Sequence, residues 1–278
     1  MATDRLRQWI DLVDACYAAD HAAAWDSVGL QVGDPDDEVT NVLVSLDVTE
    51  AVLDEARRRG ANLVLAHHPL LFRPLARLTP ATAAGKLALQ AARSGCAVLA
   101  VHTNFDAAVP GTTSPIVDLL RLQDVHPLAP LADDPSMGLG RVGDLPAGMS
   151  LRDVADRLAD GLPAPHLRVA GPLDRLIHRV AACGGAGDSL MTAAHAAGAG
   201  LYITGDLRHH VVLDALHLGM TLIDAGHYAT EAAALPALHE RLAAEAAGRG
   251  LTAGLLASAT TTEPWSPYCA HHEPKAGT

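Results

Sequence analysis

Aromatic side chains are scarce in this chain of 278 residues: Phe, Tyr and Trp together make up 3% of it. The hydrophobic cores must therefore be built mainly from Ala, Val and Leu. Apolar runs are also short, and none reaches the roughly 18 residues that a membrane span needs. Residues 1–11 are interrupted by Asp and Arg, so they lack the continuous apolar region of a secretory signal.

Cysteine and positive charge are limited as well. The four cysteines, Cys16, Cys96, Cys183 and Cys269, are too far apart in sequence for a CxxC site or a disulfide framework, so we expect reduced thiols and a cytoplasmic protein. Lys and Arg total 20 against 32 Asp and Glu, which gives a net charge of −12. This balance argues against binding of nucleic acid and against docking on anionic membranes. Histidine, by contrast, is abundant, with 15 residues.

Short apolar runs that end at polar or glycine-containing turns recur along the chain, and they are typical of strands buried on both faces. They cover residues 42–46, 62–66, 97–101, 179–182, 201–204 and 221–223. Helical patterns lie between these runs, with expected starts at Thr49, at Ser114-Pro115 and at Ser150. Strands that alternate with helices predict an α/β fold.

Two other segments complete the predicted organisation. Residues 125–150 are rich in Pro and Gly, and we interpret them as the joint between two α/β lobes. From Thr230 onward an Ala-rich and Leu-rich pattern predicts a helix with a bend at Pro236.

Potential metal ligands follow three of the predicted strands, where open α/β sheets bind their ligands. His67 and His68 precede a proline, and they either converge on one site or are ordinary surface-turn residues. Asp106 either offers an oxygen ligand or caps a turn. His227 and Glu231, four residues apart, share one helix face and form either half of a metal site or a solvated pair.

Together these five residues offer three imidazoles and two carboxylates but no thiolate, which disfavours a Cys-rich structural zinc site. Such ligands suit Zn, Fe, Mn, Co or Ni. Five of them suit two divalent ions about 3.5–4 Å apart, which predicts hydrolysis of a small molecule by a metal-bound hydroxide. His102 can act as a ligand, as an orienting residue or as a general base, and we assign it as a candidate catalytic proton shuttle.

Seven short motifs, spread over nearly the whole chain, carry a family resemblance. They occupy residues 25–33, 66–72, 101–107, 140–143, 183–187, 202–206 and 224–231. In this order they resemble the Nif-three-like family of dinuclear metal centre proteins, whose bacterial members are often labelled GTP cyclohydrolase 1 type 2 homologues.

The resemblance implies two related α/β lobes of sheet and helix layers, and a toroidal homo-hexamer. It implies that residues 1–123 and 222–278 form a discontinuous metal-binding lobe and that 124–221 form the second. It also implies two metal ions per chain, held by His67, His68, Asp106, His227 and Glu231.

Several alternatives stay open at the level of sequence. The substrate is a nucleotide or a small phosphate-containing metabolite. The reaction is either cyclohydrolase-like or that of a phosphoesterase. The alternative function is non-enzymatic metal handling or a ring scaffold.

The roles of several residues also stay open. Asp26 either approaches the metals or belongs to a structural turn with Trp25 packed in the core, which we favour. Residues 183–187 resemble a phosphate-binding loop. Arg141 is structural or anion-binding, and His209 and His210 have no assigned role.

Overall fold

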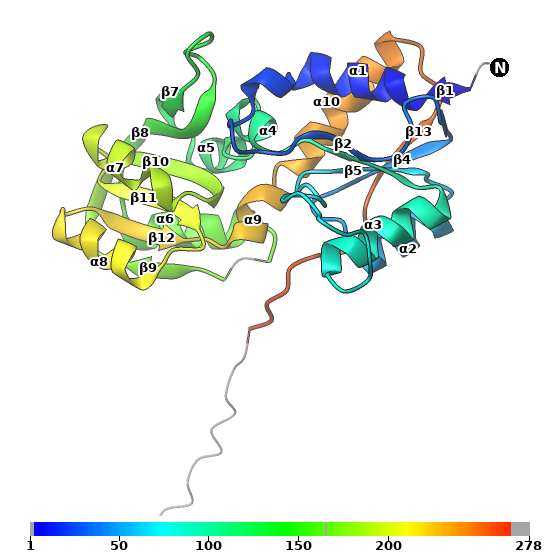
Figure 1. The fold of residues 1–278 in the computed structure, drawn as a ribbon. Coiled ribbons are helices and arrows are strands. Elements are labelled where there is room, and N and C mark those ends of the chain that lie inside the picture. Colours follow the sequence, from blue (N-terminus) through cyan, green and yellow to red (C-terminus); the bar gives the residue numbers. More distant parts are fainter. Residues whose placement is uncertain (1–2, 165, 268–278) are drawn as a thin grey trace, which may run out of the picture.

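Two sheets organise the chain in the computed structural model, which describes residues 3–164 and 166–267 (Figure 1). One sheet has five strands and the other has six. A separate two-stranded ribbon pairs β1 (Asp4–Arg5) with β3 (Glu38–Val39). Cys269 lies outside the described residues. The predicted α/β fold is confirmed.

The five-stranded sheet has the order β13-β4-β5-β6-β2 and is covered by helices on both faces (Figure 1). Its parallel strands are β13 (Gly254–Ala257), β4 (Asn41–Ser45), β5 (Leu63–Ala66) and β6 (Ala97–Ala100), and β2 (Gly29–Val32) runs antiparallel to β6. The covering helices are α1 (Leu6–Cys16) and α10 (Leu235–Gly248) on one face and α2 (Glu50–Arg58) and α3 (Ala83–Ser94) on the other. Because side chains alternate along a strand, Val42 and Val44 pack toward the first pair, whereas Leu43 packs toward the second.

The six-stranded sheet has the order β7-β8-β10-β11-β12-β9. Its strands are β7 (Gln123–Pro130), β8 (Gly138–Ser150), β10 (Leu176–Ala186), β11 (Leu201–Gly205), β12 (Thr221–Asp224) and β9 (Arg168–Ala170). One face packs on α5 (Ser114–Leu120), α6 (Leu151–Gly161) and α9 (His227–Ala232), and the other on α7 (Met191–Ala196) and α8 (His209–His217). The short helix α4 (Thr103–Ala107) follows β6. The helices of the described segments are too short or too polar to cross a lipid bilayer.

The strands and caps predicted from short-range patterns are present. Each of the six apolar runs contributes to a strand of one sheet or the other. The Thr49 hydroxyl accepts a hydrogen bond from the Val52 N–H, and Ser150 forms a capping box with Asp153. Helix α5 differs slightly, because Thr113 occupies its cap position and Ser114 is its first residue.

Residues 125–150, which we interpret as the joint between two lobes, form most of β7 and β8 in the six-stranded sheet. Pro127 and Pro130 lie in β7, an edge strand with one neighbour, where a missing N–H is tolerated. In β8 a Cβ atom at Gly143 would lie 2.8 Å from the Gln123 carbonyl oxygen, so glycine permits the close pairing. These residues therefore mark an edge hairpin of the sheet.

The helix expected from Thr230 is also different in detail. The structure has two helices, α9 and α10, and Pro236 lies in the first turn of α10, where its missing N–H leaves no helical bond unmade. The lobe boundary that we placed between residues 221 and 222 falls inside β12, which pairs with β11 and β9 in the six-stranded sheet. The division into two lobes and the hexamer stay predictions.

The segment after β13 is held against α2 by one buried carboxylate. Glu55 accepts hydrogen bonds from the Ala259 N–H, from the Ser258 hydroxyl and from both donors of Thr260, and it pairs with Arg59. Burial alone would raise the pKa of Glu55, but these hydrogen bonds lower it to about 2. The folded protein therefore stabilises the ionised form.

We predict that Glu55→Gln destabilises the protein at pH 7 by about 1–3 kcal/mol, because an amide cannot accept all of these bonds. The folded pKa lies below the ordinary value of 4.5, so the contribution is complete above pH 4.5 and is lost as the pH falls toward 2. Urea unfolding should show the difference from wild type shrink over that range. Glu50→Gln, on an exposed position of the same helix, is the matched control; equal effects of the two variants would contradict the prediction.

Candidate metal centre

The ends of strands from both sheets meet at one place and bring the candidate ligands together. His67 and His68 directly follow β5, and their N–H groups donate to the Ser45 and Leu46 carbonyls, which extends the parallel pairing beyond the strand. His227 is the first residue of α9, directly after β12 and its turn. The sequence pattern of buried strands thus positions these side chains through the backbone ladder.

Glu231 lies at the centre of this cluster. Its Oε2 atom is 3.0 Å from His68 Nε2 and 3.2 Å from His227 Nε2, and its Oε1 atom is 3.5 Å from His67 Nε2. Asp106 Oδ1 lies 3.6 Å from His67 Nε2. The five predicted ligands therefore fall into two groups, His68-His227-Glu231 and His67-Asp106-Glu231, each compact enough to hold a metal ion.

The four imidazoles of the cluster are oriented by acceptors on their outer sides. Each Nδ1 atom forms one hydrogen bond: His67 to the Val101 carbonyl (2.9 Å), His68 to Asp47 (2.8 Å), His102 to Asp26 (2.8 Å) and His227 to Asp206 (2.7 Å). An acceptor on Nδ1 keeps the proton there and leaves Nε2 free to ligate. This is the usual arrangement of metal-binding histidines.

One buried nitrogen of the cluster lacks a hydrogen-bond partner, and one buried oxygen is approached only by imidazoles. Among the described side chains, His67 Nε2 is inaccessible to water and forms no hydrogen bond. The buried Glu231 Oε2 has the Nε2 atoms of His68 and His227 beside it, at 3.0 and 3.2 Å. Buried polar atoms without a partner are costly, and a cation between them would remove the cost. The residues therefore fit a bound metal ion.

The charges of the cluster are strongly coupled. Burial would raise the pKa of Glu231, but the His67, His227 and His68 imidazoles hold it well below its usual range. Burial would lower the pKa of His68, yet hydrogen bonds to Asp47 and Glu231 raise it to about 10. Burial would also lower the pKa of His227, but hydrogen bonds to Glu231 and Asp206 raise it to about 9. Burial, together with the Glu231 charge, raises the pKa of Asp106, which accepts a hydrogen bond from Thr112.

Gly185 explains why glycines stand near the carboxyl end of β10. A Cβ atom at this residue, which has φ +65°, would lie 2.1 Å from Glu231 Oε1, so only glycine lets the backbone approach the carboxylate.

The phosphate-binding interpretation of residues 183–187 is not supported. The N–H groups of Gly184, Gly185 and Gly187 already donate to threonine hydroxyls.

The structure at residues 25–33 differs from our expectation that Trp25 packs in the core. Trp25 is 63% exposed, so it is not packed in the core. Asp26 instead holds the His102 ring, and its second oxygen accepts from the Thr103 N–H and hydroxyl. Asp26 is therefore an orienting residue of the cluster.

The remaining open residues lie outside the cluster. Arg141 is buried, and its guanidinium donates to the carbonyls of Gly138, Gly140, Ala107 and Ala108, so its role is to tie β8 to the end of α4. His209 and His210 lie exposed at the start of α8.

Sequence reasoning assigned no role to Asp47 or Asp206. Both follow buried strands, β4 and β11, and that position is the signal that could have found them. Thr262, from the segment after β13, donates its hydroxyl to Asp47 and supports it from the other side.

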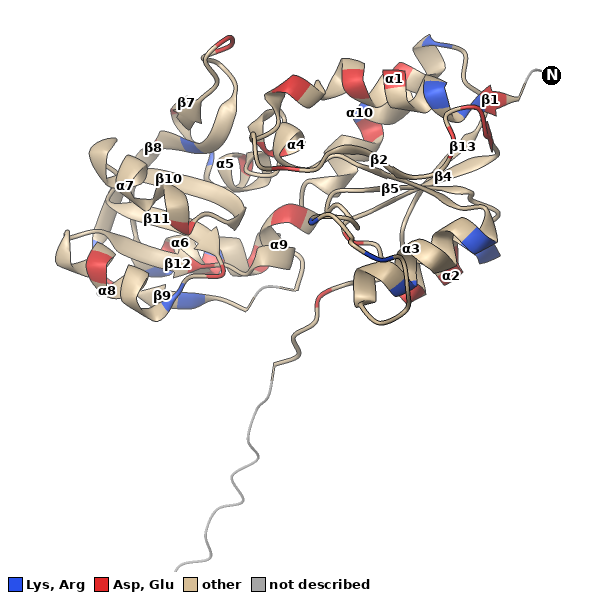
Figure 2. Ribbon diagram, in the orientation of Figure 1, with Lys and Arg blue, Asp and Glu red and all other residues tan. Residues whose placement is uncertain are grey.

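Two cavities reach the cluster, and both include His68 and His227 in their walls. The smaller, of about 400 Å³, also borders His102, Asp106 and Glu231. The larger, of about 1110 Å³, borders Asp47 and the chain segment at residues 262–267. Acidic residues, among them Asp47, Asp106, Asp206 and Glu231, border the two cavities. Figure 2 shows acidic segments in red at and beside α9.

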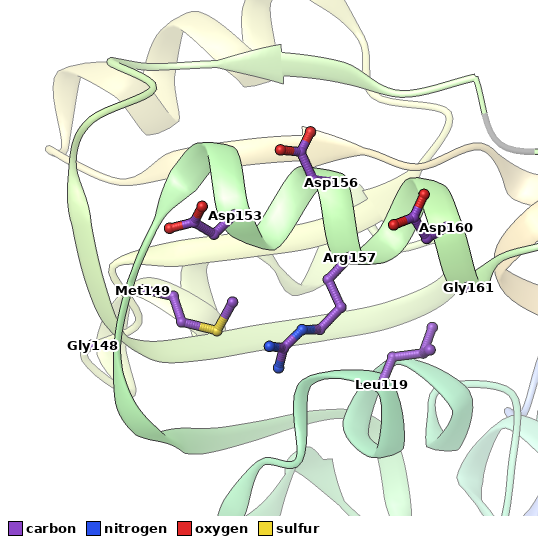
Figure 3. Close-up of a pocket in the computed structure, with 8 residues that line it drawn as sticks. All are labelled: Leu119, Gly148, Met149, Asp153, Asp156, Arg157, Asp160 and Gly161. Atoms are coloured by element: carbon purple, nitrogen blue, oxygen red, sulfur yellow. The ribbon is translucent and has the colours of Figure 1, made fainter.

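A third hollow lies on α6, away from the cluster (Figure 3). Asp153, Asp156 and Asp160 border it together with Arg157, and all four are exposed. Their charges are solvated, so this hollow offers no prepared binding group.

We predict that Asp47→Ala lowers metal affinity about 10-fold to 100-fold, because His68 loses the acceptor that fixes its ring. Competition against a chelating dye measures the change. Asp54→Ala, which removes a half-buried carboxylate of α2 that pairs with Arg57, should leave affinity unchanged. An unaltered affinity in folded Asp47→Ala would refute this orienting role.

Metal uptake is also predicted to release protons. Carboxylate partners raise the pKa values of His68 and His227 above neutrality, and coordination requires the neutral imidazoles. Their Nε2 atoms lie 3.3 Å apart, so a proton on each would be repelled by the other. We expect release of at least one proton per loaded chain at pH 7, and an affinity that rises with pH. Calorimetry in buffers of different ionisation enthalpy measures the release. Uptake without proton release would contradict the coupling.

Comparisons with known proteins agree with this fold. The family model described as Duf34/NIF3 (NGG1p interacting factor 3) matches residues 5–264. A Streptomyces coelicolor protein named GTP cyclohydrolase 1 type 2 homolog is 37% identical over 278 residues, covering 96% of this chain and 95% of its own length. A Lactococcus lactis protein of the same name is 41% identical over 210 residues, covering 74% and 79%.

The solved structures include a Bacillus cereus protein related to NIF3. It superposes with a TM-score of 0.90 at 25% identity, covering 96% of this chain and all of the other. The sequence match and the shared architecture lead to the same conclusion: this chain belongs to the Duf34/NIF3 family.

Proposed function

We propose that this protein is a hydrolase that depends on two divalent metal ions and acts on a nucleotide or a small phosphate-containing metabolite. The observation that carries the proposal is the buried Glu231 carboxylate beside the unpartnered His67 Nε2, inside a ring of imidazoles oriented from outside. Such an arrangement is costly without cations and is suited to hold them.

The grouping of side chains supports two ions rather than one. His68 and His227 face one oxygen of Glu231, and His67 faces the other. His68, His227 and Glu231 would hold one ion, and His67, Asp106 and Glu231 would hold the second. Glu231 belongs to both groups.

The types of ligand atom narrow the choice of metal but do not select one element. Imidazole and carboxylate ligands suit Zn, Fe, Mn, Co or Ni. Cys183 lies in the wall of the smaller cavity, but burial raises the pKa of its thiol, which donates to the Gly184 carbonyl. The thiol therefore stays protonated and is left out of the ligand set.

In the proposed hydrolytic step, the metal ions and the side chains of the protein have separate roles. A pair of divalent ions supplies Lewis acidity and activates water. His102, whose ring centroid lies 5.1 Å from that of His67 and 5.5 Å from that of His68, is placed to move a proton beside them. Asp26 holds its Nδ1 proton, so Nε2 is the atom that accepts or donates.

The names of the relatives support a hydrolytic reaction on a purine nucleotide. The Streptomyces coelicolor and Lactococcus lactis proteins are called homologues of GTP cyclohydrolase 1 type 2. For this chain we propose either opening of a heteroaromatic ring or cleavage of a phosphoester, since both use an activated water.

We predict that His102→Ala lowers kcat about 100-fold to 10,000-fold while the metal content stays that of wild type. Protein reconstituted with each candidate metal is assayed on pooled nucleoside phosphates, and metal content is measured on the same samples. Loss of metal in His102→Ala would contradict the proton-transfer role and make His102 a ligand. No turnover by wild type with any metal, together with reversible metal exchange, would favour metal handling instead.

A further inference from the structure

Two exposed aromatic rings lie beside the cluster in a chain that has few of them. Trp25 is 63% exposed and Phe72 is 45% exposed. Their ring centroids are 5.9 Å apart, with the planes inclined by 71°. Both also lie edge-on to His102, at 6.2 and 6.1 Å. The chain thus places two large apolar surfaces in contact with water next to a group of charged side chains.

These rings form part of the wall of the 400 Å³ cavity that contains the metal-ligand candidates. Leu139 and Leu190, from the six-stranded half of the chain, contribute further apolar surface to it. Its volume falls at the lower end of the range for small-molecule sites, about 300–1,000 Å³. The cavity is therefore large enough for one small ligand.

The residues that border this cavity offer few groups for a phosphate. Among the described residues, no Lys or Arg borders it, and its charged groups are the imidazoles and carboxylates of the cluster itself. Exposed aromatic faces bind flat rings by stacking, with little dependence on the pattern of substituents. The wall therefore favours a planar ring.

We propose that the cavity binds a planar heteroaromatic compound of purine size, with its ring stacked on one ring of the Trp25–Phe72 pair and in edge contact with the other, and with one edge directed at the cluster. The inference deepens the proposed hydrolase function, because the edge directed at the cluster would carry the bond to be hydrolysed. The aromatic pair then determines specificity for the ring, whereas His102 and the metal ligands act on it.

Calorimetric titration with inosine, on protein with and without bound Zn²⁺, tests the proposal. Trp25→Ala and Phe72→Ala should each weaken inosine binding about fivefold to 100-fold, the usual value of one stacked ring. Trp25→Phe should keep most of the affinity. Trp265→Ala is the matched control, since Trp265 is an exposed indole that borders the other cavity. Ribose alone should not bind.

The proposal would be overturned if inosine failed to bind in either metal state, or if Trp25→Ala and Trp265→Ala bound it equally. Zinc content measured on the same samples separates this result from the metal-dependent function. Wild-type protein that binds inosine but holds no metal would support the aromatic site and contradict the hydrolase. Wild-type protein that holds metal but does not bind inosine would contradict the aromatic site alone.

Discussion

The buried carboxylate of Glu231 is the constraint on which the rest of the site depends. It is 3% exposed, and a buried anion of this kind persists only when positive charge or strong donors surround it. Three imidazoles from the ends of β5 and β12 supply that environment, and Gly185 approaches closely because it has no side chain. The two sheets are thereby joined at a point where neither could form the site alone.

The fold could be predicted wherever local sequence determines structure. Runs such as residues 63–66 are apolar on both faces, which is typical of strands buried under helices on both sides. Residues 125–150 could not be predicted in this way. The pairing of β7 with β8 depends on tertiary contacts, and the prolines of an edge strand resemble those of a loop.

The candidate site was likewise predictable from the sequence only in part. The five predicted ligands follow strand ends or lie on a helix face, so their convergence could be inferred from sequence. Asp47, Asp206 and Asp26 were missed or misread, because each acts through an imidazole distant in sequence. The exposure of Trp25 could not be foreseen either, since nothing in a sequence distinguishes a large ring packed in a core from one that lines a cavity.

The proposed function depends on two metal ions bound in this cluster. Elemental analysis of untagged protein, purified without added metal and compared with the His67→Ala/Asp106→Ala double variant, tests that claim most directly. We predict about two ions per wild-type chain and their loss in the folded variant. Wild-type protein that binds no metal, even after reconstitution, would contradict the account and leave these histidines as partners of buried carboxylates alone.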